Sequence, residues 1–284
     1  MYTNDTLAGK TILVTGGGSG LGLAMAKMFG SKGAKVAICG RTESKLEKAA
    51  AEIAETGAEV KIWPVDVRDY DAVGEMIREI DKNFGELNVL VNNAAGNFLS
   101  ASEDLSPNAF KSVVDIVLNG TFNCTQHFGN LLIEKKREGN ILNIVTTYTE
   151  TGSSFVLPSA CAKAGVYAMT NTLAYEWAEY GIRANAIAPG PFPTEGAWTR
   201  LMPDPKMEEQ YKKLIPAGRY GEHEELANLA VFLVSDLSAY ITGECVTIDG
   251  GERLKAGQFN FITQAAPRPV LKQFFQMMKS GAKK

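Results

Sequence analysis

The chain has 284 residues, of which 45% are hydrophobic and 21% are charged, and its formal net charge is −3. This composition is typical of a globular domain with enough apolar material for one complete α/β sheet and its helices. The charge balance predicts no nucleic-acid partner, and since no apolar run approaches the roughly 18–20 residues that span a bilayer, we expect no membrane partner.

Strand-like apolar runs alternate with helix-length amphipathic segments along the chain. The predicted strands are 11–15, 36–39, 60–65, 87–91, 139–145, 183–187 and 245–248. The predicted helices are 22–30, 44–56, 70–83, 107–135, 159–180 and 222–235. This rhythm predicts an α/β fold in which residues 1–284 form a single doubly wound (Rossmann) domain. Its sheet is seven-stranded and mostly parallel, with helices on both faces.

Two regions depart from this rhythm. Residues 190–216 are rich in Pro and Gly, and we expect them to form a substrate-loop excursion over the C-terminal edge of the sheet. Residues 253–284 form a C-terminal extension with an apolar, aromatic stretch at 270–278. Two placements of this stretch remain open: a helix that closes over its own domain, or a segment that packs on a neighbouring subunit.

Metal-binding and targeting patterns are missing from the sequence. The four cysteines include no C-x-x-C pair, and two isolated histidines are too few for a zinc site, so no metal is expected. Residues 1–6 lack the basic and apolar start of a signal peptide, no transit peptide is evident, and the final residues differ from a peroxisomal signal. We expect a bacterial cytoplasmic protein, or else a processed form.

A glycine-rich turn follows the first predicted strand and opens a helix. Glycines allow a tight turn and a close backbone approach, and the helix offers its free N–H groups and positive dipole end to a pyrophosphate. The position of the motif at the start of the sheet makes a purely structural turn a weaker interpretation. The predicted contacts are Gly16, Gly18, Ser19, Gly20, Leu21 and Gly22.

The residues after the second and third predicted strands indicate which dinucleotide binds. Gly40 occupies the place where an NAD site usually has a carboxylate, and Arg41 can grip a 2′-phosphate, so we predict NADPH/NADP⁺. The alternative for Arg41 is a solvated surface charge. Asp66, at the end of the third strand with Val67 beside it, is predicted to accept a hydrogen bond from the adenine amino group, unless it caps a helix.

Further segments resemble the short-chain dehydrogenases/reductases over residues 9–251. They are Asn92-Asn93-Ala94-Ala95-Gly96 after the fourth strand, Asn119 in the fourth helix, and Pro189-Gly190 after the sixth strand. The resemblance implies cofactor contacts from Asn93, Ala94, Pro189, Gly190 and Phe192, and a relay or structural role for Asn119. Phe192-Pro193 departs from the usual loop sequence.

The usual catalytic pair of that superfamily, Tyr-x-x-x-Lys, is altered here. Lys163 is present, but Ser159 stands four residues before it. A Ser hydroxyl is a far poorer acid than a phenol, whose unperturbed pKa is about 10, so ordinary alcohol–ketone chemistry is disfavoured. A tyrosine, Tyr148, occurs nearby at the end of the fifth predicted strand.

This arrangement closely resembles that of the mitochondrial-type 2,4-dienoyl-CoA reductases. The matching stretches are NNAAGNFLS (92–100), LSPNAF (105–110), DIVLNGT (115–121), TTYTETGS (146–153), PSACAKAGV (158–166) and the residues around 189–201. The resemblance implies hydride transfer from NADPH to the δ-carbon of a 2,4-dienoyl-CoA and protonation to a 3-enoyl-CoA, a step of unsaturated fatty acid β-oxidation. Tyr148 and Asn97 would stabilise the thioester oxygen, Lys163 would bind the nicotinamide ribose, and Ser159 would be a hydrogen-bonding neighbour.

The same resemblance implies the partners. Arg68, Phe98, Ser106 and Arg200 match positions used around the acyl-CoA substrate, together with Tyr148. A homotetramer is expected, with the helices 107–135 and 159–180 at its interface.

Three alternatives remain open. A trans-2-enoyl-CoA reductase would saturate a monoene, and a carbonyl or 3-oxoacyl reductase would use Tyr148 on ketones. A non-catalytic NADPH-binding scaffold would bind the cofactor without turnover.

Overall fold

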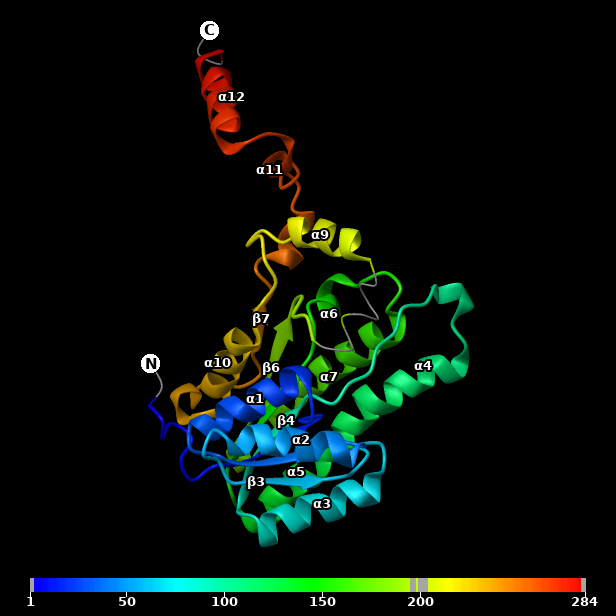
Figure 1. The fold of residues 1–284 in the computed structure, drawn as a ribbon, viewed down its shortest axis with the longest axis vertical. Coiled ribbons are helices and arrows are strands. Elements are labelled where there is room, and N and C mark those ends of the chain that lie inside the picture. Colours follow the sequence, from blue (N-terminus) through cyan, green and yellow to red (C-terminus); the bar gives the residue numbers. More distant parts are fainter. Residues whose placement is uncertain (1–2, 195–197, 199–203, 282–284) are drawn as a thin grey trace.

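The computed structural model describes residues 3–194, 198 and 204–281. Its centre is a seven-stranded sheet in the order β3-β2-β1-β4-β5-β6-β7, in which every neighbouring pair is parallel (Figure 1). The strands are β1 Thr11–Thr15, β2 Lys35–Cys39, β3 Val60–Trp63, β4 Leu87–Asn92, β5 Gly139–Ile144, β6 Ile182–Pro189 and β7 Cys245–Ile248. The predicted fold class is confirmed, and the sheet is parallel throughout.

Helices connect successive strands and cover both faces of the sheet. They are α1 Gly20–Ser31, α2 Glu43–Ala54, α3 Tyr70–Asn83, α4 Pro107–Val114, α5 Gly120–Lys135, α6 Tyr148–Thr151, α7 Leu157–Glu176, α9 Pro205–Leu214, α10 His223–Val234, α11 Ile262–Ala265 and α12 Arg268–Gly281. Short 3₁₀ turns are η1 Ser102–Asp104, η3 Ala178–Tyr180, η4 Asp236–Ser238 and η5 Glu252–Ala256.

Alternation along the buried strands divides the core between the two faces. Ile12 and Val14 of β1 pack with α1, α2 and α10, whereas Leu13 between them packs with α3, α5 and α7. All five residues of β1 are buried, which explains why its three central residues are apolar without alternation. Residues that follow the parallel strands therefore gather at one edge of the sheet, where ligands of this fold class bind.

Three segments near that edge differ from the prediction. β3 ends at Trp63 because Pro64 cannot donate to the ladder, so Asp66 lies beyond the strand rather than at its end. β5 ends at Ile144, and Tyr148 begins the short helix α6 instead of ending the strand. The predicted helix 107–135 has one π-helical turn, Asp115–Asn119, between α4 and α5.

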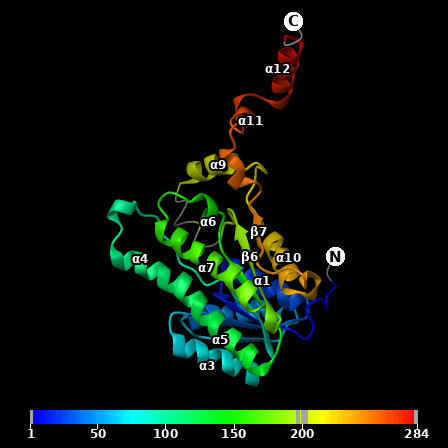
Figure 2. The same ribbon diagram turned by 180° about the vertical axis from the view of Figure 1, so that it is seen from behind.

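The chain beyond β7 leaves the domain. Figures 1 and 2 show η5, α11 and α12 extending from the C-terminal edge of the sheet, past α9, to a helix that stands clear of the body. Of the two placements left open, this structure does not show α12 closed over its own domain, and packing on a neighbouring subunit stays a prediction. α9, within the predicted excursion 190–216, lies at the same edge of the sheet.

Candidate active site and cofactor cleft

The turn between β1 and α1 requires glycine for two physical reasons. Gly16 and Gly20 have φ angles of +67° and +54°, which other residues rarely adopt. A Cβ on Gly22 would collide with the carbonyl oxygen of Gly16 and the side-chain amide of Asn93. Ser19, the N-cap of α1, makes no side-chain capping bond, so the first turn of this helix has no capping side chain of its own.

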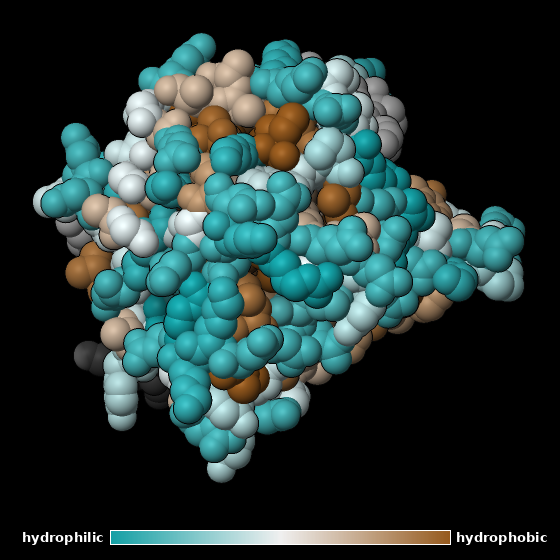
Figure 3. All heavy atoms as spheres, turned by 90° about the horizontal axis from the view of Figure 1, so that it is seen from below, coloured by the Kyte–Doolittle hydropathy of each residue, from teal (hydrophilic) through white to brown (hydrophobic). Residues whose placement is uncertain are grey.

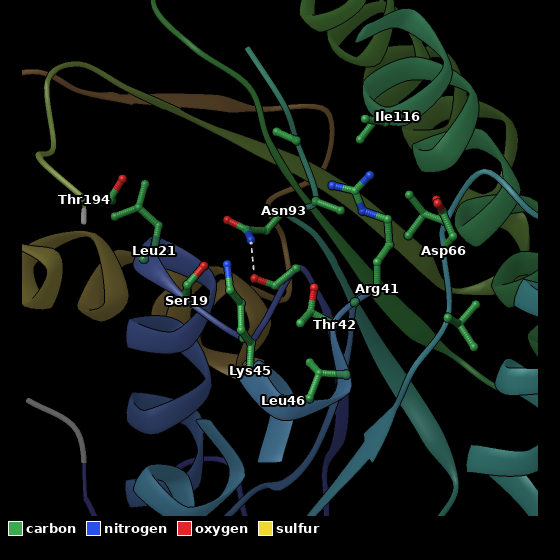
Figure 4. Close-up of a pocket in the computed structure, with 18 residues that line it drawn as sticks. Ser19, Leu21, Arg41, Thr42, Lys45, Leu46, Asp66, Asn93, Ile116 and Thr194 are labelled. Carbon is green, nitrogen blue, oxygen red and sulfur yellow. Dashed lines mark hydrogen bonds between the residues drawn. The ribbon is translucent and has the colours of Figure 1, made fainter. Parts of the chain in front are cut away.

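This turn forms one wall of a cleft of about 370 Å³ at the C-terminal edge of the sheet (Figure 4). Its walls come from the segments that follow β1, β2, β3 and β4. Ten of the predicted cofactor-binding residues line it: Gly16, Gly18, Ser19, Gly20, Leu21, Arg41, Asp66, Val67, Asn93 and Ala94. The prediction missed Gly40, Thr42, Lys45, Leu46, Val65, Ala95, Ile116 and Thr194. Lys45 is a basic residue four positions after Arg41, and this spacing is a signal for a second cation in the cleft. No feature of the neighbouring sequence indicates Thr194.

The positive charge of the cleft comes from the segment after β2. Arg41 and Lys45 both project into it (Figure 4). Within the described part of the chain, neither side chain forms an ion pair. Arg41 is therefore available to an anionic ligand.

Asp66 and Arg68 are bound to each other. Nη2 of Arg68 lies 2.6 Å from Oδ2 of Asp66, and Nε contacts both carboxylate oxygens at 3.0 and 3.1 Å. These hydrogen bonds lower the pKa of Asp66, which remains ionised near neutral pH. Arg68 is thus paired with a residue of the cofactor cleft, while 43% of its side chain stays exposed, and its predicted contact with an acyl-CoA stays a prediction.

Thr15 joins the glycine turn to the segment after β4. Its Oγ1 accepts hydrogen bonds from the backbone N–H groups of Asn93 and Ala94, both at 3.0 Å. The side-chain amide of Asn93 donates in return to the carbonyl oxygens of Thr15 and Gly16, at 3.0 and 3.3 Å. Asn93 therefore links the glycine turn to the segment after β4. Its position in the sequence did not indicate this structural role.

Tyr148, Ser159 and Lys163 lie at the same edge of the sheet. The Tyr148 hydroxyl is 2.9 Å from Oγ of Ser159, which is buried on α7. Lys163 lies one turn further along α7, and its Nζ donates to the carbonyl oxygen of Ile144, the last residue of β5. The fold therefore brings a phenol and an alcohol together from positions eleven residues apart, on the same helix face as a buried lysine.

Burial lowers the pKa of Lys163 to about 8. The amine is cationic below that pH and loses its charge as the pH rises through it. Since a cation favours an anionic intermediate in this site, we expect kcat to be constant below pH 8 and to fall above it. The measurement is kcat against pH at saturating cofactor and substrate; a kcat that stays constant through pH 8 would contradict a catalytic charge on Lys163.

The two asparagines predicted to be catalytic have different surroundings. Asn119 ends the π-helical turn, is exposed, and donates from Nδ2 to Asp115 at 3.1 Å. Oδ1 of Asn97 accepts from the N–H of Phe98 at 2.9 Å, while its amide nitrogen has no partner among the described residues. The N–H of Ser100 donates to the carbonyl of Phe155 at 2.9 Å, so the loop carrying Asn97 runs beside the segment that follows Tyr148.

Five other predicted residues lie elsewhere or cannot be placed. Ser106 caps α4, where its hydroxyl accepts from the N–H of Ala109 at 3.2 Å. Phe98 packs on an apolar cluster that includes Val113 and Val117, which leaves its contact with a substrate untested. Pro189 and Gly190 end β6 outside the lining of the cleft, and Arg200 lies outside the described residues.

The Phe192 side chain does not line the cleft, and the predicted cofactor contact of this residue stays a prediction. Phe192 is buried in the main core, with its ring against Gly221. The wall of the cleft beside Gly20 is instead Thr194, whose methyl group would lie 3.1 Å from a Cβ at that glycine. An aromatic residue that follows a buried strand is drawn into the apolar core, and the polar threonine two positions later faces the cleft.

The described residues contain no group of three or more His, Cys, Asp or Glu side chains that could hold a metal ion. In the same part of the chain, no helix is long and apolar enough to cross a membrane.

Comparisons with known proteins identify the family of this chain. Residues 16–252 match the family described as Enoyl-(Acyl carrier protein) reductase. A Caenorhabditis elegans protein named "Probable 2,4-dienoyl-CoA reductase 3", (3E)-enoyl-CoA-producing, is 45% identical over 88% of this chain and 82% of its own length. A Bacillus subtilis (strain 168) protein named "Probable 2,4-dienoyl-CoA reductase", (2E)-enoyl-CoA-producing, is 45% identical over 88% of this chain and 99% of its own.

Solved structures share the fold. A short chain dehydrogenase from Bacillus anthracis str. 'Ames Ancestor' is 48% identical, covers 86% of this chain and 96% of its own, and has a TM-score of 0.79. A gluconate 5-dehydrogenase from Burkholderia cenocepacia J2315, in complex with NADP and tartrate, is 31% identical over 88% and 97% of the two chains, with a TM-score of 0.80. The chain therefore belongs to the short-chain dehydrogenase/reductase family of oxidoreductases.

Proposed function

We propose that this protein reduces 2,4-dienoyl-CoA thioesters to 3-enoyl-CoA with NADPH, as a step in the degradation of unsaturated fatty acids. The observation that carries the proposal is the hydrogen bond between Tyr148 and Ser159, beside Lys163. This bond places a phenol near Lys163, the lysine that the family shares, although Ser159 occupies the position where the family usually has tyrosine. The names of the two dienoyl-CoA reductases that resemble this chain support the same substrate class.

The cleft fits a dinucleotide phosphate. A Cβ at Gly22 would collide with the carbonyl oxygen of Gly16. Because the turn has no side chain at this position, its backbone N–H groups stay accessible to a pyrophosphate. Arg41 stands free at the place where a 2′-phosphate lies, next to Gly40, which carries no carboxylate. When bound, NADPH supplies a hydride to the δ-carbon of the diene.

The residues of the chain then stabilise the resulting charge. Electrons displaced along the diene collect on the thioester oxygen, where the Tyr148 hydroxyl and the free amide nitrogen of Asn97 donate hydrogen bonds. Lys163 adds a positive charge from the buried side of the site and holds the ribose hydroxyls. Ser159 orients the phenol. A proton that reaches the α-carbon gives the 3-enoyl product, whereas a proton at the γ-carbon gives the 2-enoyl product.

The two relatives differ at this last step, because one is described as (3E)-producing and the other as (2E)-producing. The test is to mix the protein with NADPH and a short 2,4-dienoyl-CoA, follow cofactor oxidation, and identify the product by mass spectrometry and NMR. We expect rapid turnover to 3-enoyl-CoA; a 2-enoyl product would correct the site of protonation but keep the substrate.

Failure to turn over the diene, with NADPH still bound, would reject the proposal. Turnover of trans-2-enoyl-CoA to a saturated thioester would then indicate an enoyl reductase. Turnover of 3-oxoacyl-CoA would indicate a carbonyl reductase. Cofactor binding with no reaction on any of these substrates would indicate a scaffold.

The preference for NADPH gives a separate prediction. Replacing Arg41 with alanine removes charge-assisted hydrogen bonds worth about 1.5–3 kcal/mol, so KM for NADPH is expected to rise roughly 10- to 100-fold. KM for NADH is expected to stay unchanged, because NADH lacks the 2′-phosphate. The matched control is Arg78→Ala, which removes an exposed arginine from α3, away from the cleft. Equal KM values for NADPH in Arg41→Ala and wild type would show that Arg41 is a solvated surface charge.

A further inference from the structure

The C-terminal arm, residues 253–281, ends in an amphipathic helix whose apolar side is mostly exposed. Leu271 is the exception, since only 8% of it is exposed. Five apolar side chains of α12 are between 42% and 64% exposed: Val270, Phe274, Phe275, Met277 and Met278. Their spacing places them on one side of the helix. Among the described residues, no hydrogen bond or ion pair links α12 to residues 3–252. An apolar face of this size calls for a partner.

Charge is divided unevenly between the arm and the body. The last 32 residues hold seven of the 29 Lys and Arg residues and none of the 32 Asp and Glu residues, which gives them +7 and residues 1–252 a charge of −10. Arg268, Lys272 and Lys279 share the side of α12 opposite to the apolar face, and no carboxylate of the described chain pairs with them. The body of a second copy is therefore electrostatically complementary to the arm.

Apolar side chains that could receive α12 lie at the edge of the sheet from which the arm leaves. Leu99 follows β4, Phe155 and Leu157 follow β5, and Met207 and Leu214 follow β6; all five are exposed. The backbone of Phe155 has a φ of +66°, which is a costly conformation for an aromatic residue. The surrounding structure therefore holds the Phe155 backbone at this edge. The opposite end of the body is mainly hydrophilic, with separate small apolar patches (Figure 3).

We propose that α12 of one copy docks on this apolar edge of a second copy, and that α12 of the second copy docks on the same edge of the first. Such a reciprocal exchange closes on itself, as homo-oligomeric interfaces usually do. It would place the partner's Phe274 and Met278 over the mouth of the candidate active site. The arm begins directly after residue 252, where the match to the family ends, so this contact adds to any interface that the shared domain forms. The inference does not depend on the reaction proposed above.

Photocross-linking tests where α12 lies. The full-length protein carries p-benzoylphenylalanine in place of Phe274, or in place of Gln276 on the polar side as the matched control. We expect ultraviolet light to give a covalent dimer from the first variant, with cross-linked peptides that map to 97–101, 153–160 or 204–216, and much less from the second. Cross-links confined to single chains, or dimers whose peptides map elsewhere, would overturn the proposal.

Removing the arm tests its contribution to assembly. A chain ending at Ala266 and the double variant Phe274→Ser/Met278→Ser are compared with the full chain by light scattering over a dilution series. We expect both variants to dissociate at concentrations at least about tenfold higher than the full chain does, with unchanged NADPH binding. Unchanged assembly would overturn the proposal. So would co-sedimentation with phosphatidylcholine/phosphatidylglycerol vesicles in the absence of covalent dimers, which would assign α12 to a lipid surface.

Discussion

Replacing Tyr148 with phenylalanine is expected to lower kcat for a 2,4-dienoyl-CoA by about 10²–10³-fold, the usual cost of losing one hydrogen-bond donor to a developing oxyanion. The substitution removes one oxygen and keeps the ring, so the four residues of α6 retain their packing. KM for NADPH is expected to change little, because Tyr148 does not line the cofactor cleft. Single-turnover measurements with the purified variant separate this chemical effect from binding.

Two further variants define what the Tyr148 result means. Tyr167→Phe removes a hydroxyl from the same helix as Ser159 and Lys163, where Tyr167 packs on an apolar cluster, and is expected to leave kcat nearly unchanged. Ser159→Ala removes the partner of the phenol and is expected to cost about 2- to 10-fold, the value of one neutral hydrogen bond. A Tyr148→Phe enzyme as fast as wild type would rule out Tyr148 as the donor.

Lys163→Met is expected to lower kcat by about 10²-fold or more, because the variant removes the cation from a buried site where charge acts strongly. Methionine has a similar length and no charge to desolvate, so the variant should fold. Its remaining activity is expected to lose the decline above pH 8 that the wild type shows. A Lys163→Met enzyme that keeps this decline would show that another group titrates there.

Local sequence features were sufficient to predict the cofactor cleft. A strand, a glycine turn and a helix follow one another between Thr11 and Ser31, and Arg41 and Asp66 follow the next two strands. Ten of the predicted cofactor residues line one cleft. Parallel strands bring their C-terminal ends to one edge, so the position of a residue after its strand already places it near the others. The spacing of Ser159 and Lys163 likewise puts them on one side of a helix.

Residues whose side chains serve the fold could not be distinguished in this way. Ser106 was predicted as a substrate contact and also caps α4, Phe192 was predicted as a cofactor contact and its ring fills the core, and Arg68 was predicted as a substrate contact and pairs with Asp66. A capping hydroxyl and a ligand-binding hydroxyl look the same in a sequence. The choice depends on which groups the finished fold places within hydrogen-bonding distance.

The sequence by itself determined the order of strands and helices, the parallel sheet and the glycine cradle, because these depend on periodicity and on backbone conformations that only certain residues adopt. Tertiary structure decided the rest. It alone brought Tyr148 to within 2.9 Å of Ser159, through a break after β5 and a short helix that no periodic pattern indicates. It also placed the C-terminal helix away from the body of its own domain, since an amphipathic pattern specifies that a face must be covered but not by which surface.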